Sequence, residues 1–428
     1  MSARIILIAA IGVGSLGALP IAAAPAAAQG SIAARVAAAP DGQLSLGYAT
    51  RTGVCGDGGD VVALGGALTV YPSMESYGRW SGVKCVPGPA RVVLTVQDHR
   101  VTGVRTHVGG TSGGGATDLG TVPAADAAAY FFTLARSLDG RDSRNALLPA
   151  VIAAGGPIGA QLLSLAGDQS VSTSTRRRAT HWAGLLGDAS TVPALERLTS
   201  DTEASIAEAG LFALSAIPDG AGVPSLVRFA RAAPDERRRE KAVFWLGQSE
   251  REDALRVVRE MAADRAAPTK VRGMAIFALG QRREGAGEFE YLRTLFPTLD
   301  DDALREKVLM AASQGGSTAG SRWLLDVARD AHYSDHVRRQ AVFWAGQGGA
   351  ATKDIAALYD GLDASSRAVR EHTIFALSQR DDADATSKLM AIAKGDSDAE
   401  MRKKALFWLG QKDDPRVTKF ITDLVTGN

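Results

Sequence analysis

The spacing of apolar residues follows one pattern in the first part of the chain and another in the rest. Apolar and polar residues alternate over 44–48 and again over 91–97, which is the pattern of a half-buried β-strand. From Pro123 onward this alternation gives way to alanine-rich runs such as AADAAAYFFTLARSL, whose composition favours helices. The pattern therefore predicts a small antiparallel β domain followed by a much longer helical region.

The β domain is predicted over residues 43–110. Asp98, His99 and Arg100 separate the strand at 91–97 from a second strand-like segment, as a short hairpin connection would. A glycine-rich stretch then closes the domain. The neighbouring segments are predicted to be a Pro/Ala-rich spacer at 29–42, a Gly-rich linker at 111–122 and a helical cap at 123–170.

Beyond residue 170 the helical region repeats itself. KAVFWLGQ at 241–248 returns as QAVFWAGQ at 340–347 and as KALFWLGQ at 404–411. The final Gln recurs every 32 or 33 residues, and an Arg lies nine residues before it in each unit. With two degenerate units ahead of these, about eight helix pairs are predicted over 171–428. The marker glutamines are Gln248, Gln281, Gln314, Gln347, Gln379 and Gln411, and the preceding arginines are Arg239, Arg272, Arg305, Arg338, Arg370 and Arg402.

Helix pairs of this length cannot bury their apolar faces alone, so they are expected to stack into an α-solenoid with a continuous core. The segments VRRQAVFWAGQ and VRGMAIFALGQ resemble the V-R-x-x-A-x-x-x-L-G signature of short HEAT repeats of the bilin-lyase-like type. This resemblance implies that the Arg-bearing second helix of each pair lines the concave face. It leaves function open, because such repeats serve as scaffolds, lyase subunits and enzymes.

A column of phenylalanines is predicted along that concave face. On a helical wheel of 337–347, Val337, Ala341 and Ala345 share the core side and Phe343 lies opposite. Contiguous exposed apolar area usually marks a binding site, and varying charges beside the column would set the register of a bound peptide. The predicted partner-binding residues are Phe244, Phe277, Phe343, Phe375, Phe407, Arg339, Glu371 and Lys403.

Other interpretations of these columns stay open. The Phe rings could wedge between neighbouring second helices, and the varying charges could be ordinary solvated surface. The in-register arginines could bind an acidic ligand, or they could bond loop carboxylates and helix-end carbonyls inside the solenoid. Trp245, Trp344 and Trp408 are replaced by Ala in other units, which suggests large and small residues interleaving between layers.

Residues 1–28 are predicted to be a signal peptide. Arg4 ends a short basic region, an apolar run follows, and Ala26–Ala28 supply a small-residue cleavage site. A retained membrane anchor is the alternative, which Pro20 and Pro25 weaken, and no later run is long enough to span a membrane. The protein is therefore expected to be exported to the periplasm.

Export changes the interpretation of the two cysteines, Cys55 and Cys85. Thiols in an oxidising compartment tend to pair, so one disulfide is predicted. By the loop-entropy relation it would stabilise a small domain by about 3 to 4 kcal/mol.

Charge and motifs give little support to catalysis. The 48 Lys and Arg residues and 47 Asp and Glu residues leave a net charge of +1, so no global field favours nucleic acid as a partner. GVGSLG at 12–17 lies inside the predicted signal peptide, and GTSGG at 110–114 lacks the strand-turn-helix setting of a nucleophile elbow. His332 and His336 could hold a metal, but Asp335 between them is interpreted as a helix N-cap.

Deoxyhypusine hydroxylases are HEAT enzymes that ligate iron through His-Glu dipeptides, and this sequence has none. No catalytic residue, metal or cofactor is predicted. The favoured function is an exported scaffold that binds a protein or peptide partner in its concave groove. The alternatives are a lyase-like protein that binds a small apolar ligand there, and an envelope or sugar binder that acts through the β domain.

Overall fold

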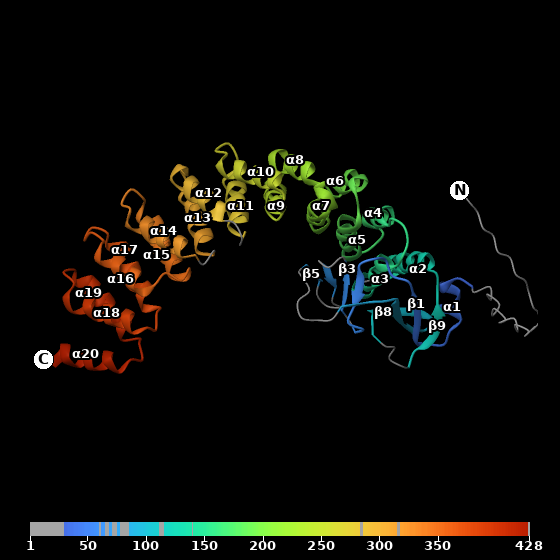
Figure 1. Ribbon diagram of the computed structural model, residues 1–428, viewed down its shortest axis with the longest axis horizontal. Helices are drawn as coiled ribbons and strands as arrows, with labels where there is room; N and C mark the ends of the chain where they lie inside the picture. The colour runs from blue at the N-terminus through green and yellow to red at the C-terminus, as the bar shows by residue number, and fades with distance from the viewer. Residues whose placement is uncertain are drawn as a thin grey trace, which may run out of the picture. The chain divides into compact units, whose positions relative to one another are not determined.

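The computed structural model describes residues 30–59, 61–64, 68–70, 75–77, 85–110, 115–138, 140–282, 286–314 and 317–426. The predicted signal peptide lies outside these residues. The contacts divide the chain into two compact units (Figure 1). The first, here called the sheet unit, extends to Leu134 and includes Leu148–Gly155. The second, here called the solenoid, comprises Ala135–Leu147 and the chain from Gly156 onward.

The sheet unit begins with a short helix and continues with nine described strands, and two helices follow. The elements are α1 (Ile32–Ala38), β1 (Gly42–Tyr48), β2 (Val54–Gly56), β3 (Val62–Leu64), β4 (Leu68–Val70), β5 (Glu75–Tyr77), β6 (Val86–Pro87), β7 (Ala90–Gln97), β8 (Arg100–Val108), β9 (Thr117–Thr121), α2 (Ala124–Ser137) and α3 (Gly140–Ile152). The division between the two units falls within α2 and α3.

One sheet has the strand order β8-β7-β1-β9 and carries the predicted alternation. Leu44, Leu46 and Leu94 are at most 1% exposed. The Tyr48 hydroxyl donates to Pro149 O at 2.9 Å, and burial raises the pKa of this phenol well above its usual value. Strand β9 pairs parallel with β1, although it lies in the segment predicted as a Gly-rich linker. Helix α1 likewise lies in the predicted spacer.

The hairpin between β7 and β8 turns at Asp98 and His99. Both residues have positive φ, 50° and 57°, as a two-residue type I′ turn requires. Their amides donate to the two carboxylate oxygens of Asp41 at 2.8 and 3.0 Å. These backbone bonds lower the pKa of Asp41. The predicted connection is therefore a tight turn, held by a carboxylate at the start of the sheet.

The other sheet has the strand order β5-β4-β3-β2-β6. Cys55 lies in β2 and Cys85 immediately precedes β6, which pairs with β2. Their sulfurs are bonded and their Cα atoms are 5.3 Å apart, within the usual range for a disulfide. The predicted disulfide is confirmed, and it joins neighbouring strands of a sheet with short strands.

The solenoid contains eight described helix pairs, from α4/α5 to α18/α19, followed by α20. Figure 1 shows the pairs succeeding one another along the chain. The helices are α4 (Gly159–Gly167), α5 (Thr173–Leu186), α6 (Val192–Leu198), α7 (Ala204–Ala216), α8 (Val223–Ala232), α9 (Glu236–Gly247), α10 (Glu252–Ala263), α11 (Thr269–Gly280), α12 (Ala286–Leu295), α13 (Asp302–Gln314), α14 (Thr318–Arg329), α15 (Asp335–Gln347), α16 (Thr352–Asp360), α17 (Arg367–Ser378), α18 (Ala383–Gly395), α19 (Ala399–Leu409) and α20 (Pro415–Thr426).

The odd-numbered helices from α5 to α19 are the second helices of these pairs. Val337, Ala341 and Ala345 on α15 are fully buried, as the helical wheel predicted. Successive second helices pack against one another more extensively than successive first helices do, as expected on the concave side of a curved stack. The N-cap of α15 is Ser334, whose hydroxyl accepts from Val337 N at 3.3 Å, and not Asp335 as predicted.

Buried arginines on several second helices join one pair to the next. Arg338 Nε donates to Ala328 O at 3.1 Å, at the end of α14, and Nη2 donates to Ser366 Oγ at 3.0 Å, in the loop before α17. The last four carbonyls of a helix lack partners within it, so the bond from Arg338 Nε to Ala328 O satisfies one of those of α14. The second bond reaches the following pair. Arg338 therefore holds three elements at once.

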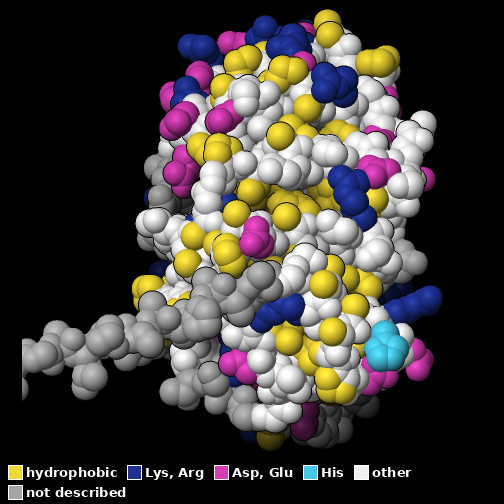
Figure 2. All heavy atoms as spheres, turned by 90° about the vertical axis from the view of Figure 1, so that its right-hand side faces the viewer, with side chains coloured by type: hydrophobic (Ala, Val, Ile, Leu, Met, Phe, Trp, Pro, Cys, Tyr) yellow, Lys and Arg dark blue, Asp and Glu magenta, His cyan; other side chains and the backbone are white. Residues whose placement is uncertain are grey.

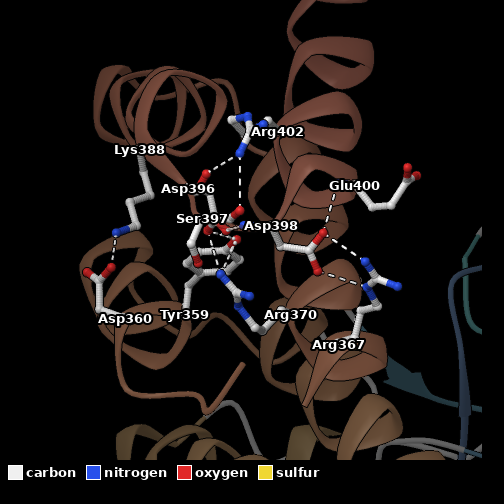
Figure 3. Close-up of polar contacts among 10 residues, drawn as sticks. All are labelled: Tyr359, Asp360, Arg367, Arg370, Lys388, Asp396, Ser397, Asp398, Glu400 and Arg402. Atoms are coloured by element: carbon white, nitrogen blue, oxygen red, sulfur yellow. Dashed lines mark hydrogen bonds and ion pairs between the residues drawn. The ribbon is translucent and has the colours of Figure 1, made fainter. Parts of the chain in front are cut away.

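The same arrangement recurs in other units. Arg272 donates to Ala262 O at 3.4 Å and pairs with Asp300 of the next unit at 3.5 Å. Figure 3 shows Arg370 between Tyr359 of its own unit and Asp396 of the next. Of the two roles considered for the Arg column, the structure shows the internal one for these residues, which bond helix-end groups and loop carboxylates. Arg176, in the degenerate first unit, makes the same contacts with Ala166 O and Asp201.

Replacing Arg338 by Met should lower the free energy of unfolding by about 2 to 3 kcal/mol, because it leaves the buried Ala328 carbonyl and Ser366 hydroxyl without a donor. Urea denaturation of the full chain measures this change. Arg322→Met is the control, since Arg322 is exposed on α14, and it should change stability by less than about 0.5 kcal/mol. Equal effects of the two substitutions would contradict the role of Arg338.

Candidate functional site

The phenylalanine column runs along the second helices, with most rings half-buried. Phe212 meets Trp245 of the next unit edge-on, with ring centroids 5.0 Å apart. Phe375 meets Trp408 in a tilted arrangement at 5.4 Å. In these units the rings wedge between neighbouring helices, which is one of the two alternatives that the sequence left open.

The packing between second helices depends on a pair of residues that we call a joint. Every second helix has a Trp or an Ala at one repeated position and a Gly or a Ser two residues later. A joint consists of the Gly or Ser of one second helix together with the Trp or Ala of the next second helix. Where one second helix carries Ser in a joint, the next second helix carries Trp; where it carries Gly, the next second helix carries Ala. The Ser–Trp joints are Ser215–Trp245, Ser313–Trp344 and Ser378–Trp408; the Gly–Ala joints are Gly184–Ala213, Gly247–Ala278, Gly280–Ala311 and Gly346–Ala376.

Most Gly–Ala joints are closed by direct approach of the helices. A Cβ placed on Gly247 would lie 2.4 Å from Ala278 Cβ, and one on Gly280 would lie 2.4 Å from Ala311 Cβ. Real Cβ atoms do not approach so closely, so only glycine fits at these two positions. Ser–Trp joints carry the large indole between the helices instead.

The Gly346–Ala376 joint is neither closed nor filled. A Cβ on Gly346 would lie 3.9 Å from Ala376 Cβ, which is ordinary contact, and no indole occupies the position of Ala376. A pocket of about 420 Å³ opens here between α15 and α17. We call it the α15–α17 cleft. It is lined by Phe343 and Phe375 and, among others, by Gln347, His372, Gln379, Arg380, Asp381 and Asp382.

The wall of the cleft carries a histidine with a lowered pKa. Burial lowers the pKa of His372, and the nearby Arg339 guanidinium lowers it further, whereas Glu371 opposes this shift. His372 is therefore neutral at pH 7. Its ring lies 6.2 Å from that of Phe375, so the two rings form one largely apolar wall.

Polar groups at the rim differ in how far the protein itself uses them. Arg380 Nη2 donates to Gly346 O at 3.3 Å. Asp382 accepts from Thr352 Oγ1 at 2.5 Å and from Ala385 N at 2.8 Å, and these bonds help to lower its pKa. Within the described part of the chain, the side chains of Asp381 and Gln347 have no hydrogen-bond partner. Their carboxylate and amide remain available to a ligand.

Two of the predicted partner-binding residues, Phe343 and Phe375, come together in the cleft. Phe244 and Phe277 are half-buried on α9 and α11, away from it. Phe407 lies on the last second helix and is 58% exposed. The column is therefore not one uniform surface.

The predicted charged residues are engaged within the solenoid. Glu371 pairs with Lys404 of the next unit at 2.5 Å, and Lys403 pairs with Glu400 at 2.8 Å. Arg339 Nε donates to Asp335 O at 3.2 Å. The polar groups that do line the cleft belong to the marker glutamines and to the loop after α17. The regular spacing of the marker glutamines in the sequence could have identified two of these lining groups, Gln347 and Gln379.

The sheet unit has a pocket of its own, of about 530 Å³. Its lining includes Tyr48, Arg91, His107 and Asp118. His107 Nδ1 lies 2.8 Å from Gly59 O, and Asp118 Oδ1 accepts from Gly120 N at 2.8 Å. This pocket is larger than the α15–α17 cleft and combines both signs of charge with a phenol, so its chemistry suits a small polar ligand.

Figure 2 shows acidic, basic and hydrophobic side chains interspersed on one face of the molecule, without one dominant charged patch. Across the described residues, no group of three or more His, Cys, Asp or Glu side chains could hold a metal ion. None of the described helices is long and apolar enough to cross a membrane.

Comparison with known proteins identifies the repeats. Residues 355–428, which run from within α16 to the end of the chain, match the family described as HEAT repeats. The chain is therefore a HEAT-repeat protein in this segment, and the earlier helix pairs have the same two-helix architecture. No curated protein matches the chain.

Two solved structures are similar over most of their length. Human deoxyhypusine hydroxylase in complex with glycerol is 17% identical, with 67% of this chain and 96% of that chain covered and a TM-score of 0.25. A designed armadillo repeat protein in complex with the peptide (KR)4 is 16% identical, with 66% and 90% covered and a TM-score of 0.14. Scores this low carry no argument about function.

The two kinds of Gly–Ala joint should respond in opposite ways to a methyl group. Gly247→Ala should lower the free energy of unfolding by about 1 to 3 kcal/mol through overpacking against Ala278. Gly346→Ala should be neutral or stabilising by up to about 1 kcal/mol, because alanine favours helix and the site has room. Chemical denaturation compares them directly. A similar loss in both would contradict an open joint at Gly346.

Proposed function

We propose that the protein is a scaffold that binds a peptide segment of a partner protein in the α15–α17 cleft. The observation that carries this proposal is the open Gly346–Ala376 joint. It leaves two aromatic side chains, Phe343 and Phe375, beside an amide and a carboxylate that the chain does not use. Aromatic anchors supply much of the binding energy at interfaces, and polar groups around them fix the register of the ligand.

A peptide suits the cleft better than a small apolar ligand. A glutamine side chain both donates and accepts hydrogen bonds, so Gln347 and Gln379 can bond the backbone of a bound segment. A lyase-like function would need an acid or base within reach of the ligand. Asp382 and Arg380 already bond groups of the chain itself, whereas Asp381 and His372 line the cleft as candidate acid–base groups, so the lyase-like function stays the alternative.

We also propose that the protein works outside the cytoplasm, in the periplasm. The support is the composition of residues 1–28 together with the Cys55–Cys85 disulfide, since structural disulfides persist in oxidising compartments. N-terminal sequencing of the protein recovered from a periplasmic fraction should begin at Gln29. Recovery of the chain from the cytoplasm with Met1 or Ser2 at its start would overturn this part of the proposal.

The pocket of the sheet unit supports a second candidate, the binding of a sugar or another small envelope component. Arg91, His107 and Asp118 bring several hydrogen-bonding groups to one cavity, as recognition of a polar small molecule requires. We favour the cleft as the binding site because the Gly346–Ala376 joint is open, whereas the other joints described are closed or filled by an indole.

A substitution that fills the joint tests the peptide-binding function. Ala376→Trp places an indole where Trp245 and Trp408 stand in other units, so the fold should be retained while the cleft closes. Selection from a displayed random-peptide library should enrich sequences on the native protein and none on this variant. Phe407→Ala is the matched control, since Phe407 is a predicted binding residue outside the cleft, and it should leave selection unchanged.

Other outcomes would separate the alternatives. Equal selection by the native protein and Ala376→Trp would exclude the cleft as the peptide site. Loss of selection with Phe407→Ala would move the site to the end of the Phe column. Failure to enrich any peptide would overturn peptide binding and leave the pocket of the sheet unit as the better candidate.

A further inference from the structure

We propose that the segment bound in the α15–α17 cleft is acidic, with a carboxylate that pairs with Arg339 while its apolar side chains contact Phe343 and Phe375. This inference rests on the proposed function and names the charge of its ligand. It follows from the ion pairs that join neighbouring second helices elsewhere in the solenoid, and from the absence of such a pair beside the cleft.

Two positions face each other across the interval between consecutive second helices. The first directly follows the position of the repeated Arg on one helix, and the second comes two residues after that position on the next helix. Between α17 and α19, Lys404 lies 2.5 Å from Glu371 in this arrangement. Between α7 and α9, Lys241 lies 3.3 Å from Glu208. In both intervals a cation on one helix meets an anion on its neighbour.

Between α15 and α17 the same two positions hold Arg339 and His372. Burial lowers the pKa of His372 and the Arg339 guanidinium lowers it further, so the two side chains lie close enough to interact. His372 is neutral at pH 7 and supplies no balancing charge. Glu371, which precedes it on α17, is already paired with Lys404. This interval therefore has a cation where two others have an ion pair.

The carboxylates on the neighbouring elements are also used by other groups. Asp335, one turn before Arg339 on α15, pairs with Arg338 at 3.3 Å. Glu306 of α13 lies 3.7 Å from His336. Across the described residues, Arg339 itself makes no ion pair. Its Nε donates to Asp335 O at 3.2 Å, which leaves the two Nη groups for an acceptor from outside the chain.

The other end of the cleft has no comparable unmatched charge. Asp381 and Asp382 line it together with Arg380, and the Lys412 ammonium lies beside them because it bonds Arg380 O. Two carboxylates are thus offset by two cations. The charge that a ligand can complement is at the Arg339 end.

Arg339 and the cleft share one face of α15. Arg339 precedes Phe343 by four residues, and residues at this spacing are neighbours on a helix surface. Phe343 and His372 both line the cleft, and Arg339 is half-buried beside them. A peptide that contacts Phe343 and Phe375 can therefore place an adjoining residue at the guanidinium. The arginine fork bonds a carboxylate through two parallel N–H groups, so Asp or Glu suits this place.

Selection from a displayed random-peptide library tests the charge of the ligand on the full chain. The native protein should enrich peptides that combine apolar residues with Asp or Glu, whereas Arg339→Glu should enrich peptides with Lys or Arg instead. Lys403→Glu is the matched control, because Lys403 holds the equivalent position on α19 and does not line the cleft. It should keep the acidic preference. The same preference on native protein and Arg339→Glu, or an equal reversal by Lys403→Glu, would overturn the assignment.

Binding measurements separate a direct pair from a general effect of charge. An enriched peptide is compared with its amide counterpart, in which Gln replaces Glu or Asn replaces Asp, by fluorescence anisotropy of the labelled peptides. The acidic peptide should bind the native protein about three- to fivefold more tightly, the size of a solvent-accessible ion pair. This difference should disappear with Arg339→Gln and shrink as the salt concentration rises to about 1 M. A difference that persists with Arg339→Gln would contradict the pair.

Failure of this inference can be distinguished from failure of the proposed function. If the native protein enriches peptides without an acidic residue and Ala376→Trp enriches none, the cleft binds peptides but the acidic assignment is wrong. If acidic peptides are enriched equally on Ala376→Trp, they bind outside the cleft and both proposals fail. Both also fail if the native protein enriches no peptide.

Discussion

A buried guanidinium between consecutive helix pairs is the interaction on which the solenoid depends. The end of each first helix presents carbonyls without intrahelical partners, and the fork of an arginine can bond such a carbonyl and a group of the next pair together. At Arg272 and Arg370 the group in the next pair is a carboxylate, whereas at Arg338 it is the neutral hydroxyl of Ser366. Arg338 spans the interval between α15 and α17. It bonds Ser366 in the loop before α17, and the missing indole leaves a cleft between α15 and α17.

The sequence predicts the architecture well because the architecture is periodic. A repeat of 32 or 33 residues, buried Val337 and Ala341, and paired Cys55 and Cys85 can all be inferred without coordinates, since each follows from spacing or composition. Strand β9 and helix α1 were missed because they lie in segments rich in small residues, where pairing with β1 and local capping outweigh weak intrinsic preferences.

The cleft could not be predicted, because the residue types that form its joint, Gly and Ala, also form closed joints elsewhere in the solenoid. Gly247–Ala278 and Gly346–Ala376 are the same pair of residue types, and they differ in how closely the Gly approaches the Ala of the next second helix. The pairing of charges beside the Phe column could not be predicted in full for a related reason. A helical wheel treats each helix alone, whereas Glu371 pairs with Lys404 on the next second helix. Contacts between units, together with pairs within one helix such as Lys403 with Glu400, decide which side chains remain available.

The open joint also has a mechanical consequence. In a solenoid each pair contacts only its neighbours, so the bending of the whole is the sum of the bending at its separate contacts. Between α15 and α17 neither the backbone approach seen at Gly247 nor an intervening indole opposes a change in angle. This interval is the most compliant of the Gly–Ala contacts compared. A ligand that contacts both Phe343 and Phe375 would link α15 to α17, so its binding in a small cleft would stiffen the solenoid against bending.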